Sequence, residues 1–164
     1  MNTADQEELL IVVDEQDNIL DYLPRSEVHK KKLLHRTSTI ITYTSNGKLV
    51  FQKRSMNKDT NPGKLGNAVG GHVTKGESYL EAAKNEAREE LNINVEPELL
   101  EKTIINDPLH RTMTSIFKIT YDGPYDFNKQ EIDEIKIFSL DEVKFHLDEL
   151  SQSTKITLQK VGVL

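Results

Sequence analysis

The sequence predicts an α/β fold (α+β in the looser usage) with a mixed central sheet. Three observations predict it: short runs of β-branched and aromatic residues early in the chain, one long amphipathic helix near its middle, and alternating strand patterns followed by a helical pattern after it. Strands, helix, strands and helix in this order are typical of a sheet covered by helices. The length of 164 residues is that of one domain, so we expect a single domain over residues 1–164.

The chain opens with a predicted hairpin. Two apolar runs, Leu9–Val13 and Ile19–Leu23, are separated by five turn-forming residues. Ser26 is expected to cap a short helix that continues to about Leu34. Together these elements form an N-terminal extension, residues 1–34, ahead of the main part of the sheet.

A second hairpin is predicted around Asn46-Gly47. This pair lies between a β-branched and aromatic run at residues 37–43 and the apolar residues 49–51. An Asn-Gly pair in this position is the strongest short-range hairpin signal. Residues 57–63 are rich in turn formers and predict a loop. Four glycines follow within residues 66–76, so the backbone there must turn sharply or approach another group closely.

The clearest predicted helix runs from Ser78 to Leu91. Ser78 followed by Glu81 fits a capping box, which satisfies free backbone donors in the first turn. Asn92 can adopt the left-handed conformation that ends many helices. At 100° per residue, one apolar stripe is formed by Leu80, Ala83, Ala87 and Leu91.

Two more strands and one more helix are expected after it. Alternation predicts a strand over residues 115–121 and another around Ile135 and Ile137. Asp141–Leu150 has the pattern of an acidic amphipathic helix. The last ten residues, 155–164, are too weakly patterned for an assignment.

Composition and charge exclude several classes of protein. With 21 Lys+Arg against 27 Asp+Glu the net charge is −6, which disfavours a general nucleic-acid binder. The absence of cysteine excludes disulfides, thiolate metal sites and thiol nucleophiles. No apolar run reaches the roughly 18–20 residues of a membrane span, and Met1–Glu8 lacks the features of a secretory signal. We therefore expect a cytoplasmic protein with no nucleic-acid and no membrane partner.

Three glutamates of the central helix form the main chemical signal. Glu86 is three residues before Glu89 and four before Glu90, so all three side chains leave one side of the helix. Carboxylates this close repel one another, and a hard divalent cation such as Mg²⁺ removes the repulsion through oxygen ligands. Such an ion can also bridge substrate phosphates. Taken alone, the run is more typical of a solvated helix face, and it is the combination with the glycine loop, Glu77 and the capped helix that favours a metal site.

Residues 71–93 resemble the Nudix box, Gly-x5-Glu-x7-Arg-Glu-U-x-Glu-Glu-x-Gly-U, in which U is apolar. The residues that match its glycine and glutamates are Gly71, Glu77, Glu86, Glu89 and Glu90. The resemblance extends over about residues 35–150 and is to the branch near isopentenyl diphosphate isomerase, which contains many hydrolases of unassigned substrate. It implies an α/β/α sandwich with a small N-terminal extension. It also implies hydrolysis, with Mg²⁺ or Mn²⁺, of a pyrophosphate bond in a nucleoside-diphosphate-linked or other diphosphate small molecule.

The resemblance also implies roles for individual residues. In the family, the three box glutamates hold the metal, and the carbonyl before the box glycine (here that of Gly70) often joins them. Glu77 would support the loop or the metal waters. A carboxylate must accept the proton of the attacking water. Glu86 is the first candidate for this general base, and Glu134 or Glu131 is the alternative. The expected catalytic residues are thus Glu86, Glu89, Glu90 and Glu134.

Asn85 departs from the family pattern, because it stands where the box has an arginine. That arginine pairs with carboxylates of the box, whereas asparagine donates hydrogen bonds without charge. Arg88, three residues further on, lies on another part of the helix and is not expected to replace it. The departure keeps open a protein that has the fold and binds a diphosphate but hydrolyses little. Asn92 in place of the last box glycine is a mild change, since asparagine tolerates the left-handed conformation.

Three further residues are expected to contact the substrate. Strand alternation sends Lys53 and Arg54 to opposite faces, and Arg54 is the candidate for a phosphate. Gly71 and His72 are the other expected substrate contacts.

A second group of residues raises the alternative of isomerase chemistry. The isomerase holds a metal with histidines, and His29, His35 and His72 lie at or near matching positions, so they are either a second metal site or structural residues. Gly70 stands where the isomerase has its catalytic cysteine, which leaves isomerase activity the runner-up. A homodimer is compatible with the sequence.

Overall fold

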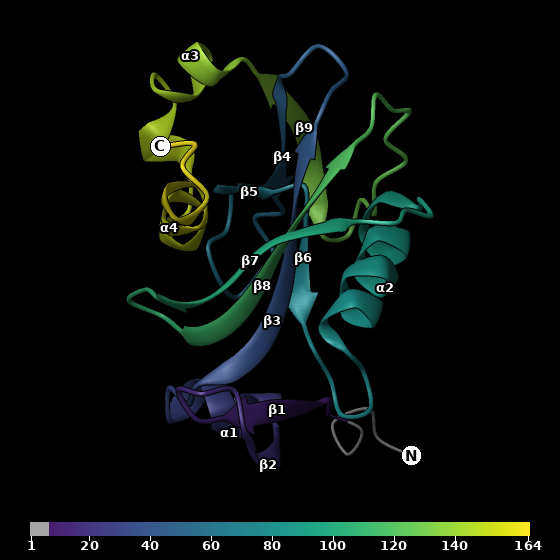
Figure 1. Ribbon diagram of the computed structural model, residues 1–164. Coiled ribbons are helices and arrows are strands. Elements are labelled where there is room, and N and C mark those ends of the chain that lie inside the picture. The colour runs from purple at the N-terminus through teal and green to yellow at the C-terminus, as the bar shows by residue number, and fades with distance from the viewer. Residues whose placement is uncertain (1–6) are drawn as a thin grey trace.

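The computed structural model describes residues 7–164, which form one nine-stranded mixed sheet with helices on both faces (Figure 1). This confirms the α/β prediction and the sandwich that the family resemblance implied. The segment Met1–Glu8, which was expected not to be a secretory signal, lies mostly outside the described part, because residues 1–6 are not described. No helix within residues 7–164 is both long and apolar enough to cross a membrane.

Strand β3 (His35–Tyr43) is the centre of the sheet. It pairs in parallel with β8 (Arg111–Thr120) and antiparallel with β6 (Val69–His72), β1 (Leu9–Val13) and β4 (Leu49–Arg54). The β3–β4 connection is the hairpin predicted at Asn46-Gly47, and Gly47 has a φ of 84° that its lack of a side chain permits.

The remaining strands extend the sheet outward. β2 (Ile19–Pro24) pairs with β1 to form the predicted N-terminal hairpin. β5 (Leu65–Asn67) and β9 (Ile132–Phe138) pair with β4, and β7 (Glu98–Asn106) pairs with β8. The sequence did not predict β5, β6 or β7. The first two are short and rich in glycine, and β7 carries polar residues on both faces.

Helix α1 (Arg25–Lys30) corrects the prediction for residues 26–34. It begins directly after Pro24 without a side-chain cap, and the Ser26 backbone and hydroxyl donate instead to the Glu7 carboxylate, at 2.5 and 2.9 Å. It ends four residues early because Lys32 has a positive φ of 51°, which the helix cannot contain.

Helix α2 (Tyr79–Leu91) matches its prediction closely. Ser78 accepts a hydrogen bond from the Glu81 backbone at 3.1 Å, and Asn92 ends the helix in the left-handed conformation. Ala83, Ala87 and Leu91 are buried against the residues of β3 and β8 on one face of the sheet. Leu80, expected in the same stripe, is 41% exposed, and its neighbour Tyr79 is the first-turn residue that packs against this core.

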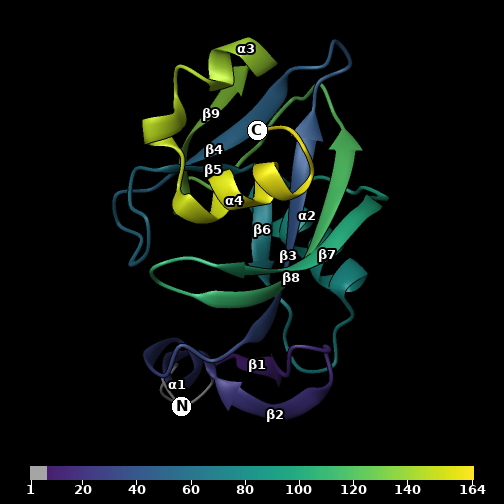
Figure 2. The same ribbon diagram turned by 60° about the vertical axis from the view of Figure 1, so that its left-hand side comes forward.

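The C-terminal part covers the opposite face of the sheet (Figure 2). The single helix predicted over residues 141–150 is wrong. The segment forms α3 (Leu140–Val143) and a 3-10 turn, η2 (Leu147–Glu149), and then becomes extended at the buried Leu150. Leu150 forms a bridge to Leu65 of β5, which a continuing helix would prevent. Helix α4 (Gln152–Lys160) follows, in a segment that had no assignment.

Candidate active site

A polar cavity of about 470 Å³ lies between the C-terminal half of α2, one face of β3 and β8, and the start of α4. It contains most of the expected site residues, which come from distant parts of the chain: Arg54, Gly70, Gly71, His72, Glu86, Glu89 and Glu90. The family resemblance and the fold therefore identify the same place on the molecule.

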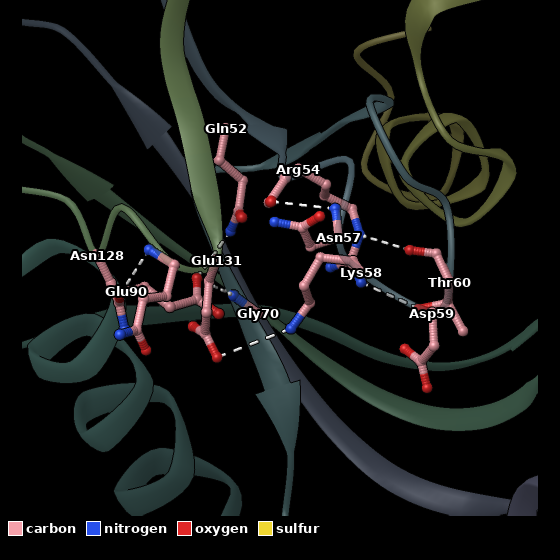
Figure 3. A network of polar contacts seen from close by, with 12 residues as sticks. Gln52, Arg54, Asn57, Lys58, Asp59, Thr60, Gly70, Glu90, Asn128 and Glu131 are labelled. Carbon is pink, nitrogen blue, oxygen red and sulfur yellow. Dashed lines mark hydrogen bonds and ion pairs between the residues drawn. The ribbon is translucent and has the colours of Figure 1, made fainter.

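Glu90 is the most unusual group in this cavity. Its side chain is buried at the foot of α2 and accepts hydrogen bonds from Gln52 Nε2 at 2.7 Å and from the Gly70 backbone at 3.4 Å (Figure 3). Burial, followed by the nearby charge of Glu86, raises its pKa well above the ordinary value. Within residues 7–164, no cation forms an ion pair with Glu86, Glu89 or Glu90. A buried carboxylate without a cation is costly, so the site fits a bound cation.

Glu86 lies directly against the glycine loop. A Cβ atom at Gly71 would overlap the Glu86 carboxylate, so only glycine allows the backbone to approach so closely. Burial raises the pKa of Glu86 to about 8, and the charges of Glu89 and Glu131 add to the effect. The pKa of Glu89, which is more exposed, is also raised. The larger cause is partial burial of its carboxylate, and the second is the negative charge of Glu131. The carboxylates therefore form one mutually repelling cluster.

Of the two glutamates proposed from the C-terminal part of the chain, Glu131 lines this cavity and Glu134 does not. Glu131 lines the cavity and lies 3.7 Å from Lys58 Nζ (Figure 3). Glu134 is exposed on β9, pairs with Lys136 at 3.1 Å, and is absent from the cavity wall. The reason is the loop before β9: Glu131 ends it at the cavity, whereas Glu134 is already inside the strand.

Cationic side chains line the wall next to Glu131. The Arg54 guanidinium donates to the Thr60 carbonyl and hydroxyl, both at 3.0 Å, and Lys58 lies on the same side (Figure 3). Lys58 and Arg25 also line the cavity. Lys53 does not line it, which agrees with the alternation expected along β4. The arrangement provides fixed positive charge beside the carboxylates, as a bound phosphate requires.

The loop that carries Gly71 is tied to α2 through Glu77. One Glu77 oxygen accepts from the Thr74 backbone at 3.0 Å and hydroxyl at 2.6 Å, and the other accepts from Asn85 Nδ2 at 2.6 Å. Arg88 in turn donates to Asn85 Oδ1. Arg88 thus contacts the residue that stands in the arginine position, one helical turn away, and forms no ion pair with a carboxylate of the box within the described residues. The Asn85 amide therefore lies between Arg88 and Glu77, accepting a hydrogen bond from the first and donating one to the second.

The expected histidines gather at the other end of the cavity. Ligand atoms of His29, His35 and His72 lie within 4.8 Å of one another, and the two Nε2 atoms of His29 and His72 are 3.2 Å apart. His35 Nδ1 donates to the Leu33 carbonyl at 2.8 Å, which leaves its buried Nε2 as an acceptor that makes no hydrogen bond within the described chain. Burial lowers the pKa of His29 to about 3 and of His35 to about 4, so both are neutral.

Two residues of the site were not foreseen. His110, from the turn between β7 and β8, has its ring centroid 4.4 Å from that of His29. Gln52, the donor to Glu90, lies inside an ordinary strand pattern that contains no signal for it. Both line the cavity, Gln52 beside the carboxylates and His110 beside the other histidines.

The comparisons with known proteins agree with this geometry. The family model described as the NUDIX domain matches residues 33–160. The chain is similar to uncharacterized Nudix hydrolases of Yersinia pestis (33% identical over 92% of this chain and 83% of that protein) and Pseudomonas aeruginosa (35% identical over 81% and 79%). It is also 37% identical, over 55% of this chain and 50% of that protein, to an isopentenyl-diphosphate Delta-isomerase of Serratia proteamaculans.

Solved structures show the same fold. A crystal structure from Deinococcus radiodurans superposes with a TM-score of 0.77 at 22% identity, over 93% of this chain and 98% of that one. A structure of a MutT protein from Methanosarcina mazei superposes with a TM-score of 0.68 at 19% identity, over 78% and 92%.

Proposed function

Since the chain belongs to the Nudix hydrolase family, we propose that it is a metal-dependent pyrophosphohydrolase that cleaves a diphosphate bond in a small molecule. The observation that carries the proposal is the buried Glu90 carboxylate, which lies beside Glu86 and, within residues 7–164, is bound only by the neutral donors of Gln52 and Gly70. Glu86, Glu89, Glu90 and the Gly70 carbonyl would hold Mg²⁺ or Mn²⁺. When bound, the ion would neutralise negative charge on the phosphoryl oxygens.

The protein's own groups supply the other requirements of the reaction. Arg54 and Lys58 would bind phosphoryl oxygens and stabilise the negative charge that develops on them. Glu86 and Glu131 both line the cavity and are the candidates to accept the proton of the attacking water. Glu77, fixed by Thr74 and Asn85, would position the glycine loop. The remaining walls would hold the group that carries the diphosphate.

A substrate panel with and without Mg²⁺ or Mn²⁺ tests the proposal. The panel contains nucleoside triphosphates, nucleotide sugars, ADP-ribose, dinucleotides, coenzyme A, thiamine diphosphate and isopentenyl diphosphate. We expect metal-dependent release of phosphate or a nucleoside monophosphate from at least one compound. Binding without release would instead favour the diphosphate-binding module. Double-bond migration in isopentenyl diphosphate would favour the isomerase, whose catalytic cysteine this chain replaces with Gly70.

We further propose that His29, His35 and His72 bind a transition-metal cation. Imidazole nitrogens suit such ions better than they suit Mg²⁺, and the free Nε2 of His35 points to an unfilled ligand position. Titration of the metal-free protein with Co²⁺ is expected to produce visible absorption bands that are lost in His72→Asn. His146→Asn is the matched control, because His146 stacks on Phe138 outside the cluster. Equal spectra for both variants would contradict the assignment.

A further inference from the structure

Hydroxyl groups dominate the wall of the cavity that lies away from the carboxylates. Odd-numbered residues of β3 and even-numbered residues of β8 share this face, since Thr37 pairs with Thr114 and His35 with Thr112. The N-terminal part of α4 closes the cavity from the other side. The hydroxyl residues that form this wall, which we call the hydroxyl wall, are Thr37, Thr39, Thr112, Thr114, Ser153 and Thr154.

Apolar side chains are scarce in the same cavity. Among the described residues that line it, Ile105 is the one aliphatic side chain apart from glycine, and no phenylalanine, tyrosine or tryptophan contributes. A binding site for an isoprenoid chain would need apolar surface, because burying such a chain against hydroxyls leaves those groups without their water partners. The lining therefore disfavours an apolar substituent on the diphosphate.

The hydroxyls along the hydroxyl wall are linked to one another by hydrogen bonds, and a contact to a backbone carbonyl at one end favours one direction for them. Thr112 donates to the Ile105 carbonyl at 3.5 Å, a long contact in which only the hydroxyl has a proton. Either oxygen of the next two pairs can be the donor, but when the Thr112 proton is donated to that carbonyl, Thr112 accepts from Thr114 across 2.8 Å and Thr114 accepts from Thr37 across 2.7 Å. Each hydroxyl has one proton and two lone pairs, so the chain leaves only lone pairs free. These three hydroxyls act toward a ligand as hydrogen-bond acceptors.

Thr39 also has no hydroxyl proton left to donate to a ligand. Its hydroxyl donates to the Val69 carbonyl at 3.0 Å and accepts from Asn67 Nδ2 at 3.3 Å, which leaves one lone pair. A phosphate oxygen carries no proton at neutral pH and cannot donate to such a wall. The groups that suit it are proton donors, above all the hydroxyls of a sugar or polyol.

From this arrangement we infer that the hydroxyl wall selects substrates whose diphosphate carries a polyhydroxylated substituent, and that Thr37 and Thr114 are specificity-determining residues. The inference rests on the proposed function, since it assigns the diphosphate to the carboxylate and arginine end of the cavity. It deepens that proposal by naming the class of substituent. A site built to accept hydrogen bonds discriminates strongly against an analogue that cannot donate them.

The experiment compares three hydroxylated diphosphates (ADP-ribose, UDP-glucose and 5-phosphoribosyl 1-diphosphate) with three apolar ones (isopentenyl, dimethylallyl and geranyl diphosphate). We expect the best hydroxylated compound to exceed every apolar one by about 100-fold or more in kcat/KM. Thr37→Val and Thr114→Val are expected to lower kcat/KM for that compound by about 5-fold each, the usual effect of one lost hydrogen bond. Rates on the apolar compounds are expected to stay within about 2-fold, because no hydrogen bond to those substituents is lost.

Thr42→Val is the matched control. Thr42 is on the same strand, is buried, and its hydroxyl has no partner within residues 7–164, but it does not line the cavity. An apolar diphosphate as the best substrate, or unchanged kcat/KM in both wall variants, would overturn the inference while leaving hydrolysis intact. If wild type cleaves none of the six, the proposed function fails for this class. Calorimetric binding of the same compounds then decides the inference, and equal affinity for both groups would overturn it.

Discussion

Replacing Glu90 with glutamine is expected to lower kcat/KM by at least about 100-fold and, at the same time, to stabilise the metal-free protein. The loss follows from removing a carboxylate that the site presents to a cation and its phosphates. The gain follows from burial: the Glu90 carboxylate is almost inaccessible and lies beside Glu86, so a neutral side chain of the same shape removes a buried, repelled charge. Gln52 Nε2 still finds an oxygen acceptor in the new amide.

Thermal unfolding with and without Mn²⁺, together with initial rates, measures both effects. We expect the melting temperature of metal-free Glu90→Gln to rise by about 2–4 °C, which corresponds to roughly 1 kcal/mol for a chain of this size. The stabilisation that Mn²⁺ gives the wild type is expected to disappear. Glu81→Gln, on the exposed side of the same helix, is the control and is expected to change neither quantity. A variant that keeps wild-type turnover would refute the metal assignment.

The second large effect is expected at Asp17, which joins four parts of the chain. From its position in the β1–β2 turn its carboxylate accepts from Arg36 of β3, Tyr79 of α2 and Lys102 of β7, each at 2.8 Å. The Asp17 side chain is only 10% exposed. Removing the one acceptor that these three donors share leaves the partly buried Arg36 and Tyr79 without it, so Asp17→Asn is expected to lower the free energy of unfolding by about 2 kcal/mol.

The pH dependence of stability provides a further test of the same residue. Burial acts to raise the pKa of Asp17, but the hydrogen bonds from Lys102, Tyr79 and Arg36 outweigh it and hold the pKa below its ordinary value of 3.8. A carboxylate with a lowered folded-state pKa stabilises the protein above its unfolded-state pKa, and this stability is lost as the pH falls through the folded-state value.

Urea unfolding at pH 7 and at decreasing pH down to about 3 measures this dependence. Asp17 has a positive φ of 65°, which an asparagine also adopts at low cost, so the backbone is not the cause of any loss. The stability gap between wild type and Asp17→Asn is expected to narrow as the pH falls. Asp21→Asn, at an exposed position of β2, is the control and is expected to change stability by less than about 0.5 kcal/mol. A gap that stays constant with pH would show that the ionised carboxylate is not what stabilises the turn.

Local signals in the sequence predicted the elements that local interactions determine. The α2 helix carries its own cap at Ser78, its own end at Asn92 and a periodic apolar stripe, so its bounds could be predicted to within a residue. The β3–β4 hairpin was predictable because Asn-Gly favours its turn before any tertiary contact forms. The helix predicted over residues 141–150 failed because Leu150 gains more from burial beside β5 than from another helical turn.

The carboxylate cluster could be predicted in advance because helical spacing alone places Glu86, Glu89 and Glu90 on one side of α2. The choice between Glu131 and Glu134 could not, since it depends on the residue at which β9 begins. The contact of Arg88 with Asn85 was not foreseen, because helix geometry describes backbone positions and not the reach of a long side chain. The homodimer and the cytoplasmic location stay predictions.

By itself the sequence determined the family, the cation-attracting carboxylates and the glycine that admits Glu86, because these depend on residue types at fixed spacings along one loop and one helix. The tertiary structure alone decided what surrounds them. Gln52 reaches Glu90, three histidines meet, and the hydroxyls of β3 and β8 align because parallel pairing brings residues 37 and 114 together across 77 positions of chain. Such contacts depend on the register between strands. This register is set by burial of the whole sheet, so the partner of a given residue cannot be predicted from a short segment of sequence.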